Sequence, residues 1–232
     1  MNPARRGPTA LASSLLAILG LMAVLAAGAQ ANWLVEGTEL TTNETVAVKP
    51  HTPWTLKVLA KNLELQCSTV ESEGLTLIAK SGTGEGKVKY SKCVTFSPPE
   101  SGKESKNCKP KEPIIAGGKT LIILHNSENW ILDEPGSGSI KFSTIEFSEL
   151  CALTESADLT GTVVLECGTL LASQWVHLDC KSSSSLRLER PAPETLFSSD
   201  SLKFGPNVAI PGGIIALSLA GINATKPWAA EI

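Results

Sequence analysis

Six cysteines behind an export leader constrain the fold of this 232-residue chain more than any other feature of its sequence. The leader opens with a pair of arginines, continues as an uncharged apolar run over residues 10–27, and ends in a small-x-small cleavage site at residues 29–31. We therefore expect residues 1–31 to form a helical signal peptide and the mature chain to begin at Asn32. The alternative is a retained leader that anchors the chain in a membrane.

Export exposes the cysteines to an oxidising compartment, where disulfides form. The cysteines are an even set, namely Cys67, Cys93, Cys108, Cys151, Cys167 and Cys180. The expected pairs are Cys67 with Cys151, Cys93 with Cys108 and Cys167 with Cys180, and the alternative joins Cys67 to Cys93 and Cys151 to Cys180. No Cys-x-x-Cys pair and no finger-like histidine spacing occurs, so the sequence predicts neither a structural zinc site nor another cofactor.

A short motif occurs twice and predicts an internal repeat. Residues 67–76 read C-S-T-V-E-S-E-G-L-T, and residues 151–160 read C-A-L-T-E-S-A-D-L-T. Two related halves, residues 32–134 and 135–232, would then lie about a pseudo-twofold axis and share one core, because a disulfide between the first cysteines of the two copies requires the halves to touch. The alternative is that two short strands share a composition by chance.

The local pattern of the mature chain predicts strands almost throughout. Runs rich in β-branched, leucine and aromatic residues occur at 54–59, 75–79, 87–90, 120–124, 139–147, 159–165, 175–178 and 214–219. Glycine- and proline-rich turns are expected at 82–86, 97–99, 117–118, 134–138 and 211–213. Short helices are expected only near 148–153 and 193–202. The predicted fold class is all-β, an antiparallel sandwich or barrel.

A lysine-rich segment is the most distinctive candidate for a binding surface. It contains Lys87, Lys89, Lys92, Lys103, Lys106, Lys109 and Lys111. On a loop closed by Cys93 and Cys108, these ammonium groups would face an anionic wall polymer or lipid headgroups. Glutamates interrupt the lysines, and the alternative is a solvated loop that keeps an edge strand from pairing with other chains.

Few residues suggest catalysis or recognition of a particular partner. His177 and Asp179 share one face of an expected strand and are the only candidates for a hydrolase. Trp54 and Trp130 would either stack on sugar rings or anchor the core. The mature chain has 18 basic and 23 acidic residues, and this acidity argues against nucleic acid as a partner.

The function expected from these features is a non-catalytic extracytoplasmic structural, adhesive or binding module. Its expected partner is a cell-wall polymer or glycan, with membrane contact only through an uncleaved leader. The secreted hydrolase is the alternative.

Several short segments together resemble a known group of proteins. They are the leader, the start at Trp33, the segment K-Y-S-K-C that ends at Cys93, the region from Pro135 through 142–145, and L-K-F-G-P-N-V-A-I-P-G-G at 202–213. These segments are similar to a family of uncharacterised secreted β-rich proteins of high-GC Gram-positive bacteria. The resemblance implies an extracytoplasmic, disulfide-bonded β protein, and it assigns no catalytic or binding residue.

Overall fold

A computed structural model describes residues 32–50, 52–125, 128–166, 186–187, 202–224, 226 and 228–231 of the chain. Residues Ala31–Ile232 form one compact unit. All strand pairs in the described part are antiparallel, and its only helical turns are three short 3-10 segments, η1 (Leu59–Lys61), η2 (Pro99–Ser101) and η3 (Gly221–Asn223). The predicted all-β fold is therefore confirmed, while the expected signal peptide lies outside the described residues.

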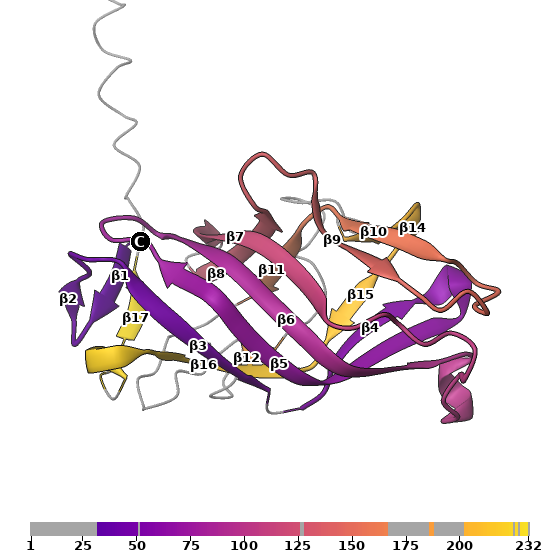
Figure 1. Cartoon of the computed structure of the whole chain (residues 1–232). Coiled ribbons are helices and arrows are strands. Elements are labelled where there is room, and N and C mark those ends of the chain that lie inside the picture. The colour runs from indigo at the N-terminus through magenta and orange to yellow at the C-terminus, as the bar shows by residue number, and fades with distance from the viewer. Residues whose placement is uncertain are drawn as a thin grey trace, which may run out of the picture. The chain divides into compact units, whose positions relative to one another are not determined.

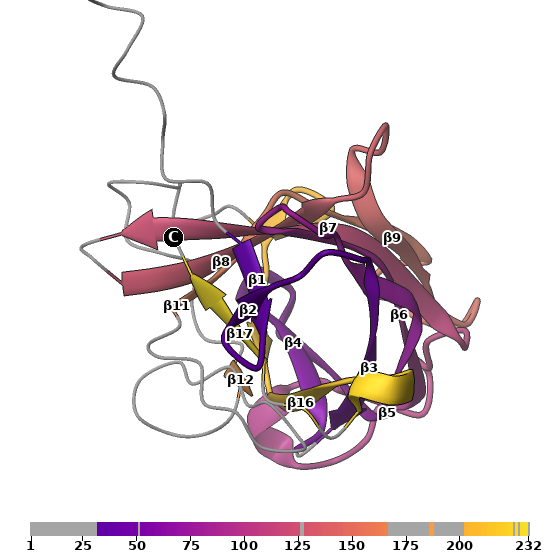
Figure 2. The same cartoon turned by 90° about the vertical axis from the view of Figure 1, so that its left-hand side faces the viewer.

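Ten strands form the main sheet (Figure 1). They are β3 (Glu44–Pro50), β4 (Trp54–Val58), β5 (Leu63–Leu77), β6 (Thr83–Phe96), β7 (Ile114–His125), β8 (Glu128–Pro135), β11 (Val163–Glu166), β12 (Leu186–Arg187), β15 (Ile210–Gly212) and β16 (Ile214–Leu219). Their order is β11-β8-β7-β6-β5-β3-β16-β12, and β4 pairs with both β5 and β15. The sheet curls around an interior, as Figure 2 shows. The edge strands β11 and β12 do not pair with each other, so the strands that the structure describes do not close into a barrel.

Two smaller sheets complete the described part. One contains β1 (Asn32–Val35), β2 (Thr38–Glu39) and β17 (Trp228–Glu231), and the other contains β9 (Lys141–Glu146), β10 (Ser156–Thr160), β13 (Lys203–Phe204) and β14 (Asn207–Val208). The first sheet lies at the end of the curled sheet that faces the viewer in Figure 2. Strand β9 packs against β7. These sheets therefore add side chains to the interior of the curled main sheet.

The β5–β6 hairpin is the longest structural unit, with strands of 15 and 14 residues. Its turn lies at residues 78–82, so the turn predicted at 82–86 was placed too far along the chain: Gly84 and Gly86 belong to β6. A register shift in the hairpin brings the backbone of Leu75 close to Gly86, where an added Cβ would stand 2.4 Å from the Leu75 Cα. Glycine at this position reflects close backbone approach rather than a turn.

The core follows the two-residue period of the strands. In β4, Trp54, Leu56 and Val58 are buried, while Lys57 between them is exposed. Similar alternation buries Leu63 and Leu65 of β5. Each such side chain contributes about 1.5–3 kcal/mol on burial, so the sheet is stabilised by many aliphatic contacts.

Other boundaries also differ from the sequence-based expectations. The predicted strand at 159–165 is two strands, β10 and β11, interrupted at Gly161, which has a φ of 89°. Gly117 and Gly118 lie inside β7 rather than in a turn. The short helix expected at 148–153 is a tight turn closed by the hydrogen bond from Cys151 N to Ser148 O, 2.9 Å. The strand expected at 175–178 lies outside the described residues.

The disulfides correct the expected pairing. Cys67 bonds to Cys93, and Cys108 bonds to Cys151. The expected Cys67–Cys151 and Cys93–Cys108 bonds were wrong, and of the alternative pairing only Cys67–Cys93 is confirmed. The reason is strand register, because the β5–β6 hairpin places Cys67 directly opposite Cys93. Cys167 and Cys180 lie outside the described residues.

The two copies of the cysteine motif have different conformations. Residues 67–76 are one continuous stretch of β5, whereas residues 151–155 form turns that precede β10. The two motif cysteines are also bonded to different partners. The structure therefore gives no support to the predicted duplication.

Candidate ligand-binding cavity

The inner face of the curled sheet lines a cavity of about 190 Å³. Its described walls come from the main sheet and from both smaller sheets, and they are predominantly apolar. A dry protein cavity of roughly 150 Å³ is large enough to bind benzene. The cavity can therefore hold an aromatic ring with a short substituent.

Strand alternation explains which side chains face the cavity. On β6, Val88 and Tyr90 line it, while Lys87 and Lys89 project from the other face, as the two-residue period of a strand requires. Space remains because small residues occupy several inward positions, namely Gly84, Gly86, Ala116 and Gly118. Larger side chains at these positions would fill the cavity.

Aromatic side chains are concentrated around the cavity. Five of the chain's eleven aromatic residues line it, namely Trp33, Trp54, Tyr90, Phe142 and Trp228. The rings of Trp54 and Tyr90 lie 4.5 Å apart between centroids, and those of Trp33 and Trp228 lie 5.8 Å apart. Trp54 is buried, so it is an interior side chain and not a surface platform for sugars. The side chain of Trp130 lies outside the description.

The indole nitrogens of the Trp33–Trp228 pair differ in their hydrogen bonding. Trp33 Nε1 donates to the Thr83 carbonyl oxygen at 2.7 Å. Trp228 is only 2% exposed, and its Nε1 has no hydrogen-bond acceptor among the described residues. A buried donor without a partner costs roughly 1–3 kcal/mol.

Asp133 places a carboxyl group in this apolar setting. It lies on β8 opposite Thr120 of β7, and Thr120 Oγ1 donates to Asp133 Oδ1 at 2.6 Å. Both residues line the cavity, whereas their neighbours Lys119 and Glu134 form a 3.0 Å ion pair, as expected for the opposite face of the same two strands. Burial raises the pKa of Asp133 to about 6, and the hydrogen bond from Thr120 opposes part of that rise.

Tyr90 is the second titratable group that lines the described part of the cavity. Burial raises its pKa well above the ordinary tyrosine value, and the negative charge of Asp133 raises it further. Tyr90 therefore keeps its proton at neutral pH. No lysine, arginine or histidine is among the described residues that line the cavity, so none of these wall residues supplies a cation for Asp133.

The sequence did not single out this group of residues. Asp133 follows Ile131 at a spacing of two in the segment W-I-L-D-E-P, and both side chains line the cavity. An acidic residue at an inward position of an apolar strand was the available clue. Recognising it requires the register of β8, which the sequence alone does not supply.

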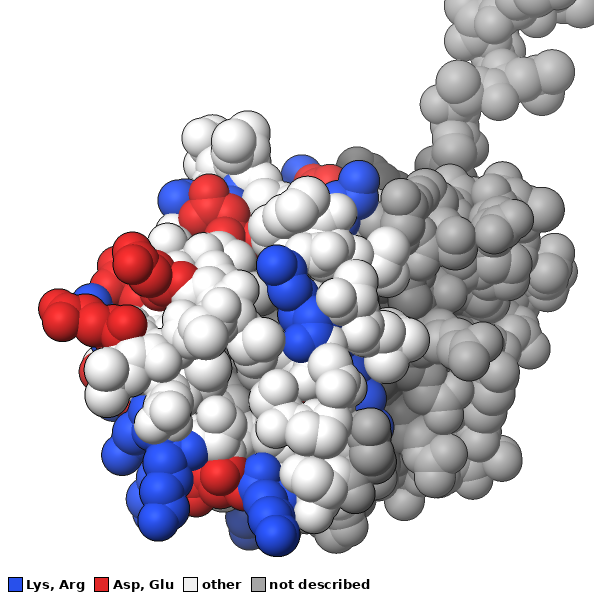
Figure 3. All heavy atoms as spheres, turned by 90° about the vertical axis from the view of Figure 1, so that its right-hand side faces the viewer, with Lys and Arg blue, Asp and Glu red and all other residues white. Residues whose placement is uncertain are grey.

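The seven predicted lysines do not form one clipped loop. Lys87, Lys89 and Lys92 lie on β6, and Lys103, Lys106, Lys109 and Lys111 follow η2 on exposed backbone. Two of them are paired with acids, Lys89 with Glu71 at 3.6 Å and Lys111 with Glu146 at 3.0 Å. One end of the described part, shown in Figure 3, has basic side chains interspersed with acidic ones. The described surface in that view therefore offers no continuous basic patch.

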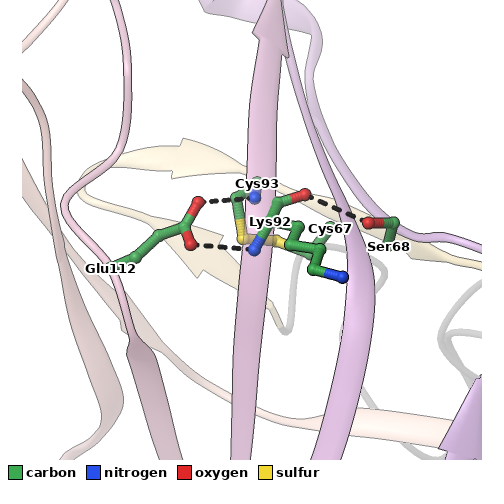
Figure 4. Close-up of a disulfide and its surroundings, with 5 residues drawn as sticks. All are labelled: Cys67, Ser68, Lys92, Cys93 and Glu112. Atoms are coloured by element: carbon green, nitrogen blue, oxygen red, sulfur yellow. Dashed lines mark hydrogen bonds between the residues drawn. A yellow bond between two sulfur atoms is a disulfide. The ribbon is translucent and has the colours of Figure 1, made fainter.

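Glu112 binds the backbone of β6 where this strand extends beyond the start of β7 (Figure 4). Glu112 accepts hydrogen bonds from the backbone N–H groups of Lys92, at 2.8 Å, and Cys93, at 2.6 Å. Lys92 has a φ of 52°, and consecutive N–H groups beside such a residue can converge on one anion. Glu112 thus takes the place of a strand partner next to the Cys67–Cys93 disulfide. Glu112 was not predicted from the sequence.

The described residues contain neither the predicted hydrolase pair nor a candidate site for metal binding. His177 and Asp179, the candidate hydrolase pair, lie outside the described residues. Among the residues that are described, no group of three or more histidine, cysteine, aspartate or glutamate side chains is arranged to hold a metal ion. The described part also contains no helix long and apolar enough to cross a membrane.

No family model, curated protein or solved structure matches the chain. The resemblance to secreted β-rich proteins of high-GC Gram-positive bacteria therefore stays a prediction. The two disulfides indicate an oxidising, extracytoplasmic environment.

Proposed function

We propose that the chain is an extracytoplasmic binding protein that holds a small, mainly apolar ligand inside its curled sheet. The observation that carries the proposal is the cavity of about 190 Å³ with aromatic walls and one inward carboxyl group. Ligand sites commonly combine an apolar lining with a few polar groups that fix the orientation of the ligand.

The composition of the walls supports a binding site over a packing defect. Glycine and alanine at inward positions of β6 and β7 leave space, and Asp133 and Thr120 add polar side chains to the lining. A cavity that arose only from loose packing would gain stability if those polar groups were apolar. Within the wider class of structural, adhesive or binding modules, these features favour a binding protein.

The other functions considered have less support in the described part. An adhesive surface for wall polymer or glycan would rest on lysines that are interspersed with acids and on Trp54, which is buried. A hydrolase would rest on His177 and Asp179, which lie outside the described residues.

A pair of variants on β7 tests the proposal. Toluene and 2-phenylethanol serve as neutral probes, and their binding to the oxidised mature chain is followed by tryptophan fluorescence, because three tryptophans line the cavity. Ala116→Phe should abolish binding by filling the cavity. Ile115→Phe, at the next and exposed position, should leave binding unchanged. Absence of binding to the unmodified chain, or equal effects of the two variants, would contradict an interior site.

A further inference from the structure

We propose that the ligand is a small amine, with an aromatic or branched apolar body, whose ammonium group pairs with Asp133. This inference rests on the proposed function and specifies the class of ligand that the cavity selects. Three features of the described walls support it: an inward carboxyl group without a cation among those wall residues, an aromatic pair in the same lining, and a limited volume.

The charge of the site favours a cation. Thr120 satisfies one oxygen of Asp133, Oδ1, and no described residue donates a hydrogen bond to Oδ2. A carboxylate in apolar surroundings is costly unless a positive group accompanies it. An ammonium group would supply both the charge and the hydrogen-bond donors, whereas an anionic ligand would be repelled.

The aromatic walls favour the same class of ligand. Tyr90 lines the same cavity as Asp133, and the negative charge of Asp133 helps to raise the pKa of the phenol. Tyr90 in turn packs on Trp54, with their ring centroids 4.5 Å apart. Aromatic faces that line the same cavity attract ammonium groups through cation–π interactions, and the rings pack on the apolar body of the ligand.

The size of the cavity limits the ligand to a compact molecule. At about 190 Å³, the cavity exceeds the roughly 150 Å³ that accommodates benzene, but only by the space of a short substituent. A polyamine with several charges would not suit it, because Asp133 is the only acidic residue among the described residues of the lining. A monoamine with one ring or a branched chain fits both the volume and the charge.

A matched pair of probes tests the inference. 2-Phenylethylamine and 2-phenylethanol have nearly the same shape and differ in charge. Calorimetric titration at pH 7.5 should show the amine binding at least about tenfold more tightly, as expected for a desolvated, hydrogen-bonded ion pair. Asp133→Asn should remove this preference while 2-phenylethanol still binds. Glu134→Gln, at the adjacent outward position, should preserve the preference.

A pH titration of the unmodified protein gives a second readout that needs no variant. The preference for the amine should fade between pH 7.5 and pH 4.5, because Asp133 becomes protonated while the amine keeps its charge. Tyr90 is the other described titratable group that faces the cavity, and it does not ionise in this range. On the opposite face of the strands, Lys119 and Glu134 pair with each other. On the neighbouring strand β11, the residue opposite Asp133 is Val163, which carries no charge.

The outcomes separate the inference from the function on which it rests. Equal affinities for the amine and the alcohol, or an amine preference that survives Asp133→Asn, would overturn the choice of ligand class while leaving a neutral ligand site. If neither probe binds, the proposed function fails together with the inference.

Discussion

Replacing Asp133 by asparagine should make the protein more stable above pH 6. The carboxyl group of Asp133 lines an apolar cavity, and burial raises its pKa to about 6. In the unfolded chain the pKa of an aspartate is about 3.9. The folded state therefore binds the proton more tightly than the unfolded state, and it loses stability as pH rises from about 4 to about 6.

The size of the effect follows from the difference between the two pKa values. About two units correspond to roughly 3 kcal/mol of stability lost at neutral pH relative to acidic pH. Asp133 retains some solvent contact, so an effect on the order of 2 kcal/mol is the more realistic expectation. Asparagine has nearly the same shape and carries no charge, and it should recover that amount.

Urea unfolding of the oxidised mature chain at pH 4.5 and pH 7.5 measures this effect. Asp133→Asn should exceed the unmodified protein in stability at pH 7.5, and most of the difference should disappear at pH 4.5. The control Glu134→Gln removes a half-exposed ion pair with Lys119 and should change stability by less than about 1 kcal/mol. A variant of Asp133 that is less stable than the unmodified protein at pH 7.5 would refute the view that this carboxylate is ionised at a cost.

Three further predictions concern the scaffold around the cavity. Replacing Cys108 and Cys151 by alanine opens a link with a sequence separation of 43 and should lower the free energy of unfolding by about 4 kcal/mol, as measured by urea unfolding; an unchanged midpoint would contradict the pairing. Gly86→Ala should lower the free energy of unfolding by more than about 3 kcal/mol, because the new Cβ would overlap Leu75. The control Gly102→Ala also has a positive φ but open surroundings, and it should cost about 1 kcal/mol. Equal shifts in Tm for the two variants would show that contact with Leu75 is unimportant. Glu112→Gln should cost about 1–2 kcal/mol because one of two backbone N–H groups loses its acceptor, and amide hydrogen exchange at Cys93 should accelerate, an effect that a purely surface role would not produce.

The sequence alone was sufficient to predict the fold class and the face of a strand to which a side chain points. The strand predicted at 87–90 lies within β6, and its alternating sequence puts Val88 and Tyr90 on the cavity face and the two lysines on the other. That information is local, because successive residues of a strand point to opposite faces wherever the strand lies.

The arrangement of the site depends on contacts that are distant in sequence. Cys67 meets Cys93, and Asp133 meets Thr120, only because particular strands pair in a particular register. Register is fixed by the packing of whole strands and by turn geometry, which short motifs do not encode. The repeated cysteine motif led to the wrong disulfide pairing for this reason: Cys67 lies within β5, whereas Cys151 lies in a turn before β10.

Glycine was the other source of error. Gly84 and Gly86 were expected in a turn, because glycine commonly provides turn conformations. In the folded chain they line the cavity within β6, and Gly86 is required by the close approach of Leu75. Glycine is needed here because the neighbouring strand leaves no room for a Cβ, and this requirement appears only once the two strands are paired.

The most direct test of an interior receptor for amines is the pKa of Asp133 itself, measured by carboxyl carbon NMR with and without 2-phenylethylamine. Without the amine, the pKa should lie near 6 because the carboxyl group is buried. With saturating amine, it should fall by at least about one unit, since a neighbouring positive charge favours the ionised form. A pKa near 4 without ligand, or one that the amine leaves unchanged, would contradict the account.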